Sequence, residues 1–232
     1  MTTAVAINGS PRMEKGDTAL VLTPFLRGME SGGCEVELFY ADRLTVKPCD
    51  CGEMRCWERT PGRCVHKDDM EGVLAALRNA NILVLATPVY VPLPGAMQNV
   101  INRLCPLLDP VLRTREGRTR ARFRADVQIR KIALVCTSGW WEKENCDTVL
   151  RIAEELAENA SVEFAGAVLR PHASLLKREG ELTEEGKAVL EAAERAGREL
   201  VETGTIGPAT LEEVSRPLIS RETLMRWLNQ GP

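Results

Sequence analysis

The sequence lacks the features of a membrane protein or of a nucleic-acid-binding protein. Among its 232 residues, no apolar run approaches the roughly 18 residues of a membrane-spanning helix. The net charge is −3, which argues against general binding to nucleic acid. The N-terminus enters an apolar run without a basic segment, so we expect no signal peptide and a cytoplasmic location. The eight cysteines are then expected as reduced thiols or metal ligands rather than disulfides.

Two common phosphate-binding motifs are also missing. In the nucleoside-triphosphatase loop GxxxxGK[ST], Lys and then Ser or Thr directly follow the second glycine. Here Asp17 and Thr18 follow Gly16, so the groups that bind magnesium and the γ-phosphate are absent. The dinucleotide fingerprint GxGxxG is absent as well, because Ser10 and Pro11 stand where its second glycine would be.

The N-terminal stretch nevertheless has a clear local pattern. The short apolar run Ala4–Ile7 predicts one buried strand, and a Gly/Ser loop then leads to a helix that begins at Asp17. Such a turn gathers unpaired backbone N–H groups at the positive end of a helix dipole, which suits a phosphate. The hydroxyls and positive charges available to it are those of Ser10, Thr18, Arg12 and Lys15. From this stretch alone, a phosphate site and an ordinary turn without a ligand both remain open.

Five predicted strands alternate with helices, which is the pattern of a doubly wound parallel α/β sheet with helices on both faces. The strands are expected at 4–7, 34–40, 81–86, 131–136 and 162–168, and the helices at 17–31, 68–79, 94–108, 145–159 and 183–203. We take 1–203 as one domain, with a cysteine-rich insert at 45–67 and an arginine-rich connection at 109–128. The remainder, 204–232, is expected to be an interface arm with one or two short helices. Ligands bind beyond the carboxyl ends of such strands, so the loops after the first, third and fourth strands should converge.

Four segments of the sequence are informative when they are taken together. They are Asn8-Gly9-Ser10-Pro11-Arg12, Thr87-Pro88-Val89-Tyr90, the run from Cys56-Trp57 to Cys64 and Lys67-Asp68-Asp69-Met70, and Ile101-Asn102-Arg103. In combination they resemble the flavodoxin-like NADPH-dependent FMN reductase superfamily, particularly its iron–sulfur flavoprotein branch, with Asn102 where that family has Asp. The resemblance extends to about residue 170 and leaves out the extension after Gly204. It implies a five-stranded flavodoxin-like sheet, FMN as cofactor and NAD(P)H as a co-substrate. It also implies a homodimer or homotetramer with the flavin near a subunit interface.

The resemblance assigns roles to residues in three loops. It implies that the FMN phosphate is surrounded by Ser10, Arg12, Asp17 and Thr18, and that the isoalloxazine meets Pro88, Val89 and Tyr90 on one side and Thr137, Ser138 and Gly139 on the other. Tyr90 and Trp140 offer flat apolar faces for stacking. The alternatives are a rim aromatic for Tyr90 and a packing pair for Trp140 with Trp141. No catalytic side chain is assigned, because the cofactor carries the chemistry while the protein positions it and tunes its potential.

Four cysteines of the insert could supply the four thiolates that a 4Fe–4S cluster needs. They are Cys49, Cys51, Cys56 and Cys64. The iron–sulfur flavoproteins show C-x2-C-x2-C and then a fourth cysteine, whereas the spacings here are C-x-C, C-x4-C and C-x7-C. A cluster, no metal and a tetrahedral zinc site therefore remain open, in that order. His66 lies beside these cysteines but is not needed as a ligand, and nothing in the sequence assigns His172 to the site.

The other cysteines and the arginines receive structural interpretations. Cys34, Cys105 and Cys136 are expected as small buried apolar residues. Cys146 is expected as an inert thiol, although its place at a helix start can lower a thiol pKa. The arginines of the 109–128 connection are interpreted as a solvated loop or a subunit contact, ahead of a site for NADPH phosphates or for an acidic partner.

The sequence therefore predicts an FMN-dependent oxidoreductase or electron-transfer flavoprotein. A 4Fe–4S cluster, if bound, would divide two-electron chemistry into single-electron steps for a ferredoxin-like carrier. The enzyme alternative is a cluster-free NAD(P)H-dependent quinone or flavin reductase. An alternative of another class is a zinc-stabilised module that senses flavin or binds a partner without turnover.

Overall fold

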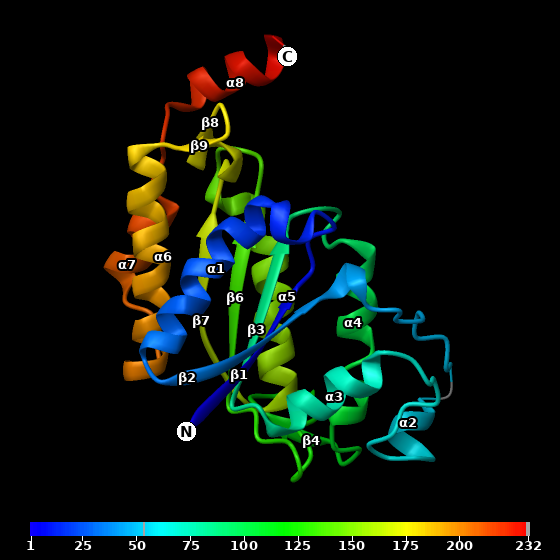
Figure 1. Ribbon diagram of the computed structural model, residues 1–232. Helices are drawn as coiled ribbons and strands as arrows, with labels where there is room; N and C mark the ends of the chain where they lie inside the picture. The colour runs from blue at the N-terminus through cyan, green and yellow to red at the C-terminus, as the bar shows by residue number, and fades with distance from the viewer. Residues whose placement is uncertain (53, 231–232) are drawn as a thin grey trace.

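The computed structural model describes residues 1–52 and 54–230. One residue of the insert and the last two of the extension therefore lie outside the described part. A five-stranded sheet forms the centre, in the order β2-β1-β3-β6-β7, with every neighbouring pair parallel (Figure 1). Its strands are β1 (Thr2–Asn8), β2 (Cys34–Tyr40), β3 (Ile82–Pro88), β6 (Lys131–Thr137) and β7 (Glu163–Arg170). This confirms the predicted fold class and its five strands.

Helices cover both faces of the sheet (Figure 1). One layer contains α1 (Asp17–Ser31), α6 (Glu184–Thr203) and α7 (Pro208–Ser215), and the other contains α3 (Met70–Asn79), α4 (Gly95–Asn102) and α5 (Asp147–Ala160). Strand β1 serves both layers, since Ala4 and Ala6 pack with the first and Val5 and Ile7 with the second. All four side chains are buried, which explains the uninterrupted apolar run of this strand.

Helices α1 and α6 approach each other closely at two glycines. A Cβ atom on Gly28 would lie 1.8 Å from the carbonyl oxygen of Glu194, and one on Gly197 would lie 1.9 Å from that of Phe25. Only residues without a side chain fit these two positions. The helices are therefore in backbone contact, and this contact fixes how α6 lies over the sheet.

The predicted helix at 94–108 is wrong at its C-terminal end. Helix α4 stops at Asn102, and a short 3-10 helix, η3 (Cys105–Leu107), follows it. Pro106 explains the break, because proline lacks a backbone N–H and its ring clashes with the preceding helical turn. The chain leaves the helical path here, and η3 contacts the short helix α2 (Arg55–Glu58) of the cysteine-rich insert.

Two short antiparallel hairpins are not predicted from the sequence. They are formed by β4 (Arg113–Arg115) with β5 (Arg118–Arg120), and by β8 (Lys177–Arg178) with β9 (Glu181–Leu182). Each turns through a Glu-Gly pair with positive φ, at 51° and 73° for Glu116 and Gly117 and at 53° and 87° for Glu179 and Gly180. Two positive φ values suit a type I′ turn, whose usual sequence signal is Asn-Gly or Asp-Gly. Glutamate in the first position hides that signal.

The C-terminal extension forms two helices, α7 and α8 (Arg221–Gln230). Helix α7 packs on α6 and β7, with Val214 fully buried, whereas α8 projects beyond the carboxyl end of the sheet (Figure 1). The remaining short helices are η1 (Met13–Lys15), η2 (Ala41–Arg43), η4 (Lys143–Cys146) and η5 (Ala173–Leu176). Within the described residues, no helix is long and apolar enough to cross a membrane.

Candidate functional site

A cavity of about 200 Å³ lies at the carboxyl ends of the central strands. Its lining includes every residue that the sequence assigns to FMN except Trp140, namely Ser10, Arg12, Asp17, Thr18, Pro88, Val89, Tyr90, Thr137, Ser138 and Gly139. Ala173 and Ser174 of η5 complete it. These two residues are not predicted from the sequence, although they follow the fifth strand and so reach the same edge of the sheet. The loops after β1, β3 and β6 therefore converge as the fold class predicts.

The first wall is the loop between β1 and α1. The side-chain oxygen of Asn8 accepts a hydrogen bond from Ser10 N at 2.9 Å, and Gly9 N donates to the carbonyl of Ala86 at 2.7 Å. These bonds hold the loop against β3. A Cβ on Gly16 would lie 2.7 Å from Ser10 Oγ, so the loop can close over the Ser10 hydroxyl only with glycine there. Behind it, the first-turn N–H groups of α1 have no partner within the helix.

The charge at this wall is balanced locally. The Arg12 guanidinium lies 3.5 Å from the Asp17 carboxylate, and both side chains keep some exposure to solvent. Asp17 also occupies the first turn of α1, where the helix dipole favours a negative charge. An incoming phosphate would compete with Asp17 for Arg12 and for the same helix end.

The second wall follows β3. Val89 N donates to the carbonyl of Thr137 at 2.8 Å, which ties this loop to the end of β6. Tyr90 N donates to the carbonyl of Pro92 at 2.7 Å, and the Tyr90 side chain is 52% exposed at the rim. The adjacent Val91 is fully exposed. An apolar, uncovered rim therefore stands over a polar cavity.

The third wall is the segment 137–141, and here the two tryptophans differ. Trp140 is 66% exposed and does not line the cavity, so the structure does not bring it together with the other predicted residues. Trp141 donates its indole N–H to the carbonyl of Ile219 at 2.9 Å and packs against the C-terminal extension. The alternative of a packing residue describes Trp141, whereas Trp140 stands free at the surface.

Polar groups in and behind the cavity walls have unused hydrogen-bonding capacity. Asn8 Nδ2 and Ser138 Oγ are buried and have no hydrogen-bond partner in the described part of the protein. Buried polar groups normally have partners, so the Ser138 hydroxyl, which lines the cavity, marks a place where a ligand would bond, whereas Asn8 lies behind the lining. Together with the helix N-terminus and Arg12, the Ser138 hydroxyl fits a phosphorylated polar ligand such as FMN. The volume is below the range of about 300–1,000 Å³ usual for ligand pockets, so part of an FMN would lie over the rim.

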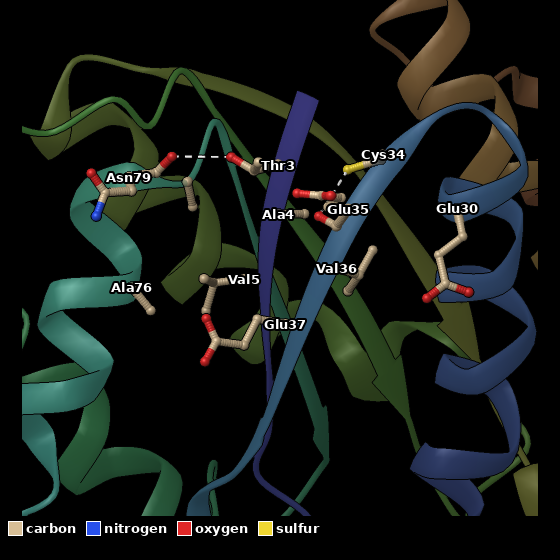
Figure 2. Close-up of a pocket in the computed structure, with 11 residues that line it drawn as sticks. Thr3, Ala4, Val5, Glu30, Cys34, Glu35, Val36, Glu37, Ala76 and Asn79 are labelled. Atoms are coloured by element: carbon tan, nitrogen blue, oxygen red, sulfur yellow. Dashed lines mark hydrogen bonds between the residues drawn. The ribbon is translucent and has the colours of Figure 1, made fainter. Parts of the chain in front are cut away.

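A larger hollow of about 670 Å³ lies at the opposite end of the sheet, beside the edge strand β2 (Figure 2). It is open, and Glu30, Glu35 and Glu37 contribute three carboxylates to its lining. These charges would repel a phosphate, and the helices that contribute to the lining, α1 and α3, do so at their C-terminal ends. The smaller cavity at the carboxyl ends is therefore the better candidate for a phosphorylated cofactor.

The cysteines of the insert lie away from this cavity, toward the other end of α4, where Figure 1 shows α2. The thiols of Cys49 and Cys51 are 3.8 Å apart. Interaction with Cys105, and then burial, raises the pKa of the Cys56 thiol. Cys56 also interacts with Cys51. The expectation that Cys105 is simply a buried apolar residue is therefore wrong, because the break at Pro106 brings its thiol to the insert. Among the described residues, no three His, Cys, Asp or Glu side chains converge as a ready metal site.

A buried ion pair fixes the insert to the end of α4. Arg103 donates to both carboxylate oxygens of Asp68, at 2.8 and 3.0 Å, and to the carbonyl of Lys47 at 2.7 Å. Both charged side chains are almost fully buried, with 1% and 2% exposed. The two segments that carry the resemblance outside the cavity, 67–70 and 101–103, are thus joined by this pair.

The arginines of the 109–128 connection lie near the amino ends of the sheet strands, where Figure 1 shows β4. Arg118 and Arg120 pair with Glu155 and Glu158 of α5, and Arg122 pairs with Asp109. These contacts support the structural interpretation, since Arg118 and Arg120 pair with α5, and Arg122 pairs within its own connection, at the end away from the cavity. His66 pairs with Asp50 at 2.7 Å beside the cysteines. His172, unassigned by the sequence, is fully buried directly behind the third wall.

Comparison with known proteins agrees with this geometry. A model of the family described as NADPH-dependent FMN reductase matches residues 2–140. Two iron–sulfur flavoproteins of Archaeoglobus fulgidus are 32% and 31% identical over 105 and 100 residues, which is 44% and 43% of this chain and 46% and 47% of theirs. An iron–sulfur flavoprotein of Methanocaldococcus jannaschii is 34% identical over 104 residues. The chain thus spans about half the length of the curated relatives it matches.

Solved structures share the fold at low sequence identity. An NAD(P)H:quinone oxidoreductase from Methanothermobacter marburgensis is 17% identical with a TM-score of 0.59, over 86% of this chain and 98% of its own. An FMN-dependent NADH-azoreductase from Bacillus anthracis, in complex with FMN, is 14% identical with a TM-score of 0.60, over 88% of this chain and 100% of its own. At such identities the likeness concerns the fold. Because the family match covers more than half of the chain, the protein belongs to the NADPH-dependent FMN reductase family.

Proposed function

We propose that the protein is an FMN-dependent oxidoreductase that takes electrons from NAD(P)H and passes them to a small acceptor such as a quinone. The observation that carries the proposal is the cavity that the loops after β1, β3 and β6 form together, with a helix N-terminus, Arg12 and the unpartnered Ser138 hydroxyl. FMN, when bound, supplies the hydride and electron chemistry. The residues of the chain then act by binding, orienting and covering it.

The first wall would hold the phosphate. The Ser10 hydroxyl and the first N–H groups of α1 are donors, and Arg12 adds positive charge at the solvent side. The second and third walls would hold the isoalloxazine, with backbone groups of Val89 and Gly139 near its edges and Tyr90 against its face. Asp17 is the only carboxylate in the described lining, and no histidine lines it. We therefore assign no general acid or base to the protein.

A 4Fe–4S cluster in the insert is the second candidate feature. Its support is that the four predicted ligands, Cys49, Cys51, Cys56 and Cys64, all lie near Cys105, together with the iron–sulfur flavoproteins among the relatives. A cluster at that place would relay single electrons to a ferredoxin-like carrier. Iron, sulfide and zinc analysis of protein prepared without oxygen separates the cluster, a zinc site and free thiols.

We also propose that a second copy of the chain covers the rim in a homodimer or homotetramer. The cavity is too small to enclose FMN, and Tyr90, Val91 and Trp140 expose apolar surface around it. Sedimentation analysis should show an oligomer, and a monomer that still binds FMN tightly would contradict this proposal. We place the protein in the cytoplasm because NAD(P)H is an intracellular reductant.

The test of the function is FMN binding by purified protein, followed by NADPH oxidation with a quinone acceptor. Ser10→Ala and Arg12→Ala should each weaken FMN binding about 10-fold or more, since a hydrogen bond to a charged group contributes about 1.5–3 kcal/mol. Glu35→Gln, in the hollow beside β2, is the matched control and should leave binding unchanged. A wild-type protein that binds no FMN, or variants that bind it equally well, would overturn the proposal.

A further inference from the structure

The third wall of the cavity is supported from behind by the turn that follows β7. Arg170 pairs with Thr137 in the register of β7 and β6, and its carbonyl accepts a hydrogen bond from Ser138 N at 3.0 Å. Ala173 N donates back to the carbonyl of Ser138 at 3.0 Å, and His172 N donates to that of Trp140 at 2.8 Å. Segments 137–140 and 170–173 are therefore joined by backbone hydrogen bonds, and both contribute to the cavity.

The Arg170 side chain within this support is fully buried, and none of its hydrogen-bond acceptors carries a negative charge. Its guanidinium donates to the carbonyls of Pro171 at 2.6 Å, Val214 at 2.7 Å and Arg216 at 3.0 Å. The fourth contact is with His172 Nε2 at 2.7 Å. Buried charges are normally paired with an opposite charge. The pKa of Arg170 is lowered to about 10 by burial and then by Arg216, so the group still carries its positive charge at neutral pH.

The Arg170 charge lies near a buried thiol beside the cavity wall. The Cys146 thiol lies beside Ser138, and its pKa is lowered first by interaction with Cys136 and also by Arg170. Ser138 is itself part of the lining. In a poorly screened interior, a positive charge behind the wall favours negative charge within the cavity.

The C-terminal extension keeps Arg170 in place. Two acceptors of its guanidinium, the carbonyls of Val214 and Arg216, belong to the extension, and Leu218 N donates to His172 Nε2 at 3.2 Å. Since Nε2 accepts from Leu218 N, His172 is neutral, and Arg170 is the donor in their contact. Arg221 pairs with Glu142 at 2.8 Å next to the same wall. These contacts lie outside residues 2–140, which the family match covers.

We propose that Arg170, held by the C-terminal extension, is a positioning residue that orients segment 137–141 and favours reduced over oxidised FMN in the cavity. This inference rests on the proposed function. Reduced FMN carries more negative charge on its isoalloxazine than oxidised FMN. A fixed positive charge behind the wall therefore stabilises the reduced form more and raises the reduction potential of the bound flavin.

The experiment measures the dissociation constants of oxidised and reduced FMN for wild type and two variants. Arg170→Gln removes the charge, and we expect the ratio of the reduced to the oxidised dissociation constant to rise about 10-fold. For a two-electron couple this equals a fall of about 30 mV in potential. Arg216→Glu keeps Arg170 but puts a carboxylate on an exposed neighbour of its guanidinium, so it should shift the ratio in the same direction. Arg118→Glu, at the other end of the sheet, is the control.

The outcomes separate the inference from the function. A raised ratio in Arg216→Glu supports the inference even if Arg170→Gln fails to fold. If both reduced and oxidised FMN bind more weakly by the same factor in both variants, the charge has no such role and the inference is overturned. A wild type that binds FMN with ratios unchanged in both variants overturns only the inference. A wild type that binds no FMN overturns the proposed function and this inference with it.

Discussion

The hydroxyls of Thr18 and Thr137 form a buried hydrogen bond, with 2.8 Å between their oxygens, at the bottom of the cavity. Thr18 belongs to the first turn of α1 and Thr137 ends β6, so the bond joins the wall expected to hold a phosphate to the wall expected to hold a flavin ring. Both side chains line the cavity and are almost fully buried. The two walls are therefore joined by a direct hydrogen bond before any ligand binds.

Removing one partner of this bond should cost stability. In Thr18→Val the hydroxyl of Thr137 stays buried without its partner, and we expect the free energy of unfolding to fall by about 1–3 kcal/mol. The double variant Thr18→Val/Thr137→Val should lose less than the sum of the single variants, because neither hydroxyl is then left alone. Urea unfolding without added FMN measures both effects. Strictly additive losses would show that the two hydroxyls are not coupled.

His172 should make the protein less stable in mild acid. Burial, and then the Arg170 charge, lower its pKa from 6.5 to about 4. Below pH 6.5 the unfolded chain takes up a proton here that the folded protein does not, so the contribution to stability is full above 6.5 and falls as the pH drops. By pH 4 the loss reaches about 3 kcal/mol, since one pKa unit corresponds to about 1.4 kcal/mol.

The check is urea unfolding from about pH 7.5 to about pH 4.5, in wild type and in His172→Asn. Asparagine tolerates the positive φ of 37° at this position but does not titrate. The variant should lose most of the pH slope between these limits. An unchanged slope would assign the acid sensitivity to other groups.

The contact between α1 and α6 should not tolerate a methyl group. Gly197→Ala places a Cβ against the carbonyl of Phe25, and we expect a loss of at least about 2 kcal/mol in the free energy of unfolding. Gly72→Ala in α3 is the matched control, because nothing lies within 4 Å of its Cβ. That variant should gain about 0.5–1 kcal/mol from helix propensity. Similar results for both glycines in denaturant unfolding would contradict the close crossing.

The buried Arg103–Asp68 pair should be needed for folding of the insert. Arg103→Met leaves the Asp68 carboxylate buried without its partner, and we expect a loss of about 3–5 kcal/mol. The exposed pair of Arg122 with Asp109 is the control, and Arg122→Met should cost less than about 1 kcal/mol. Denaturant unfolding at neutral pH compares the two variants. Equal losses would mean that burial of the first pair has no energetic consequence.

The Arg103–Asp68 pair also makes the stability of the protein depend on pH in acid. Burial raises the pKa of Asp68, but hydrogen bonds from Arg103 and from the N–H groups of Lys47 and Met70 outweigh it and lower the pKa below 3.8. The stabilisation is thus present above pH 3.8 and is lost as the pH falls further. Asp68→Asn should reduce the pH dependence of the free energy of unfolding in that lower range. The pH dependence that comes from His172 should stay in place.

Much of the fold and of the cavity is predictable because its signals are local. An apolar run marks each central strand, and Gly/Ser or Pro-containing turns end β1, β3 and β6, so the predicted ligand loops converge at one edge of the sheet. The extent of α4 and the two hairpins are missed for local reasons too. Pro106 ends the helical path, and Glu-Gly turns imitate Asn-Gly turns without their usual sequence signal.

The sequence by itself determined the order of strands and helices, the loops that line the cavity and the family to which they belong, since each depends on neighbours within a few residues. Only the tertiary structure decided which distant side chains meet. It brought Cys105 to Cys56, left Trp140 outside the cavity and put Arg170 between its wall and the C-terminal extension. Such contacts depend on how whole elements pack, because burial and hydrogen-bond satisfaction are properties of the assembled layers and not of any one segment.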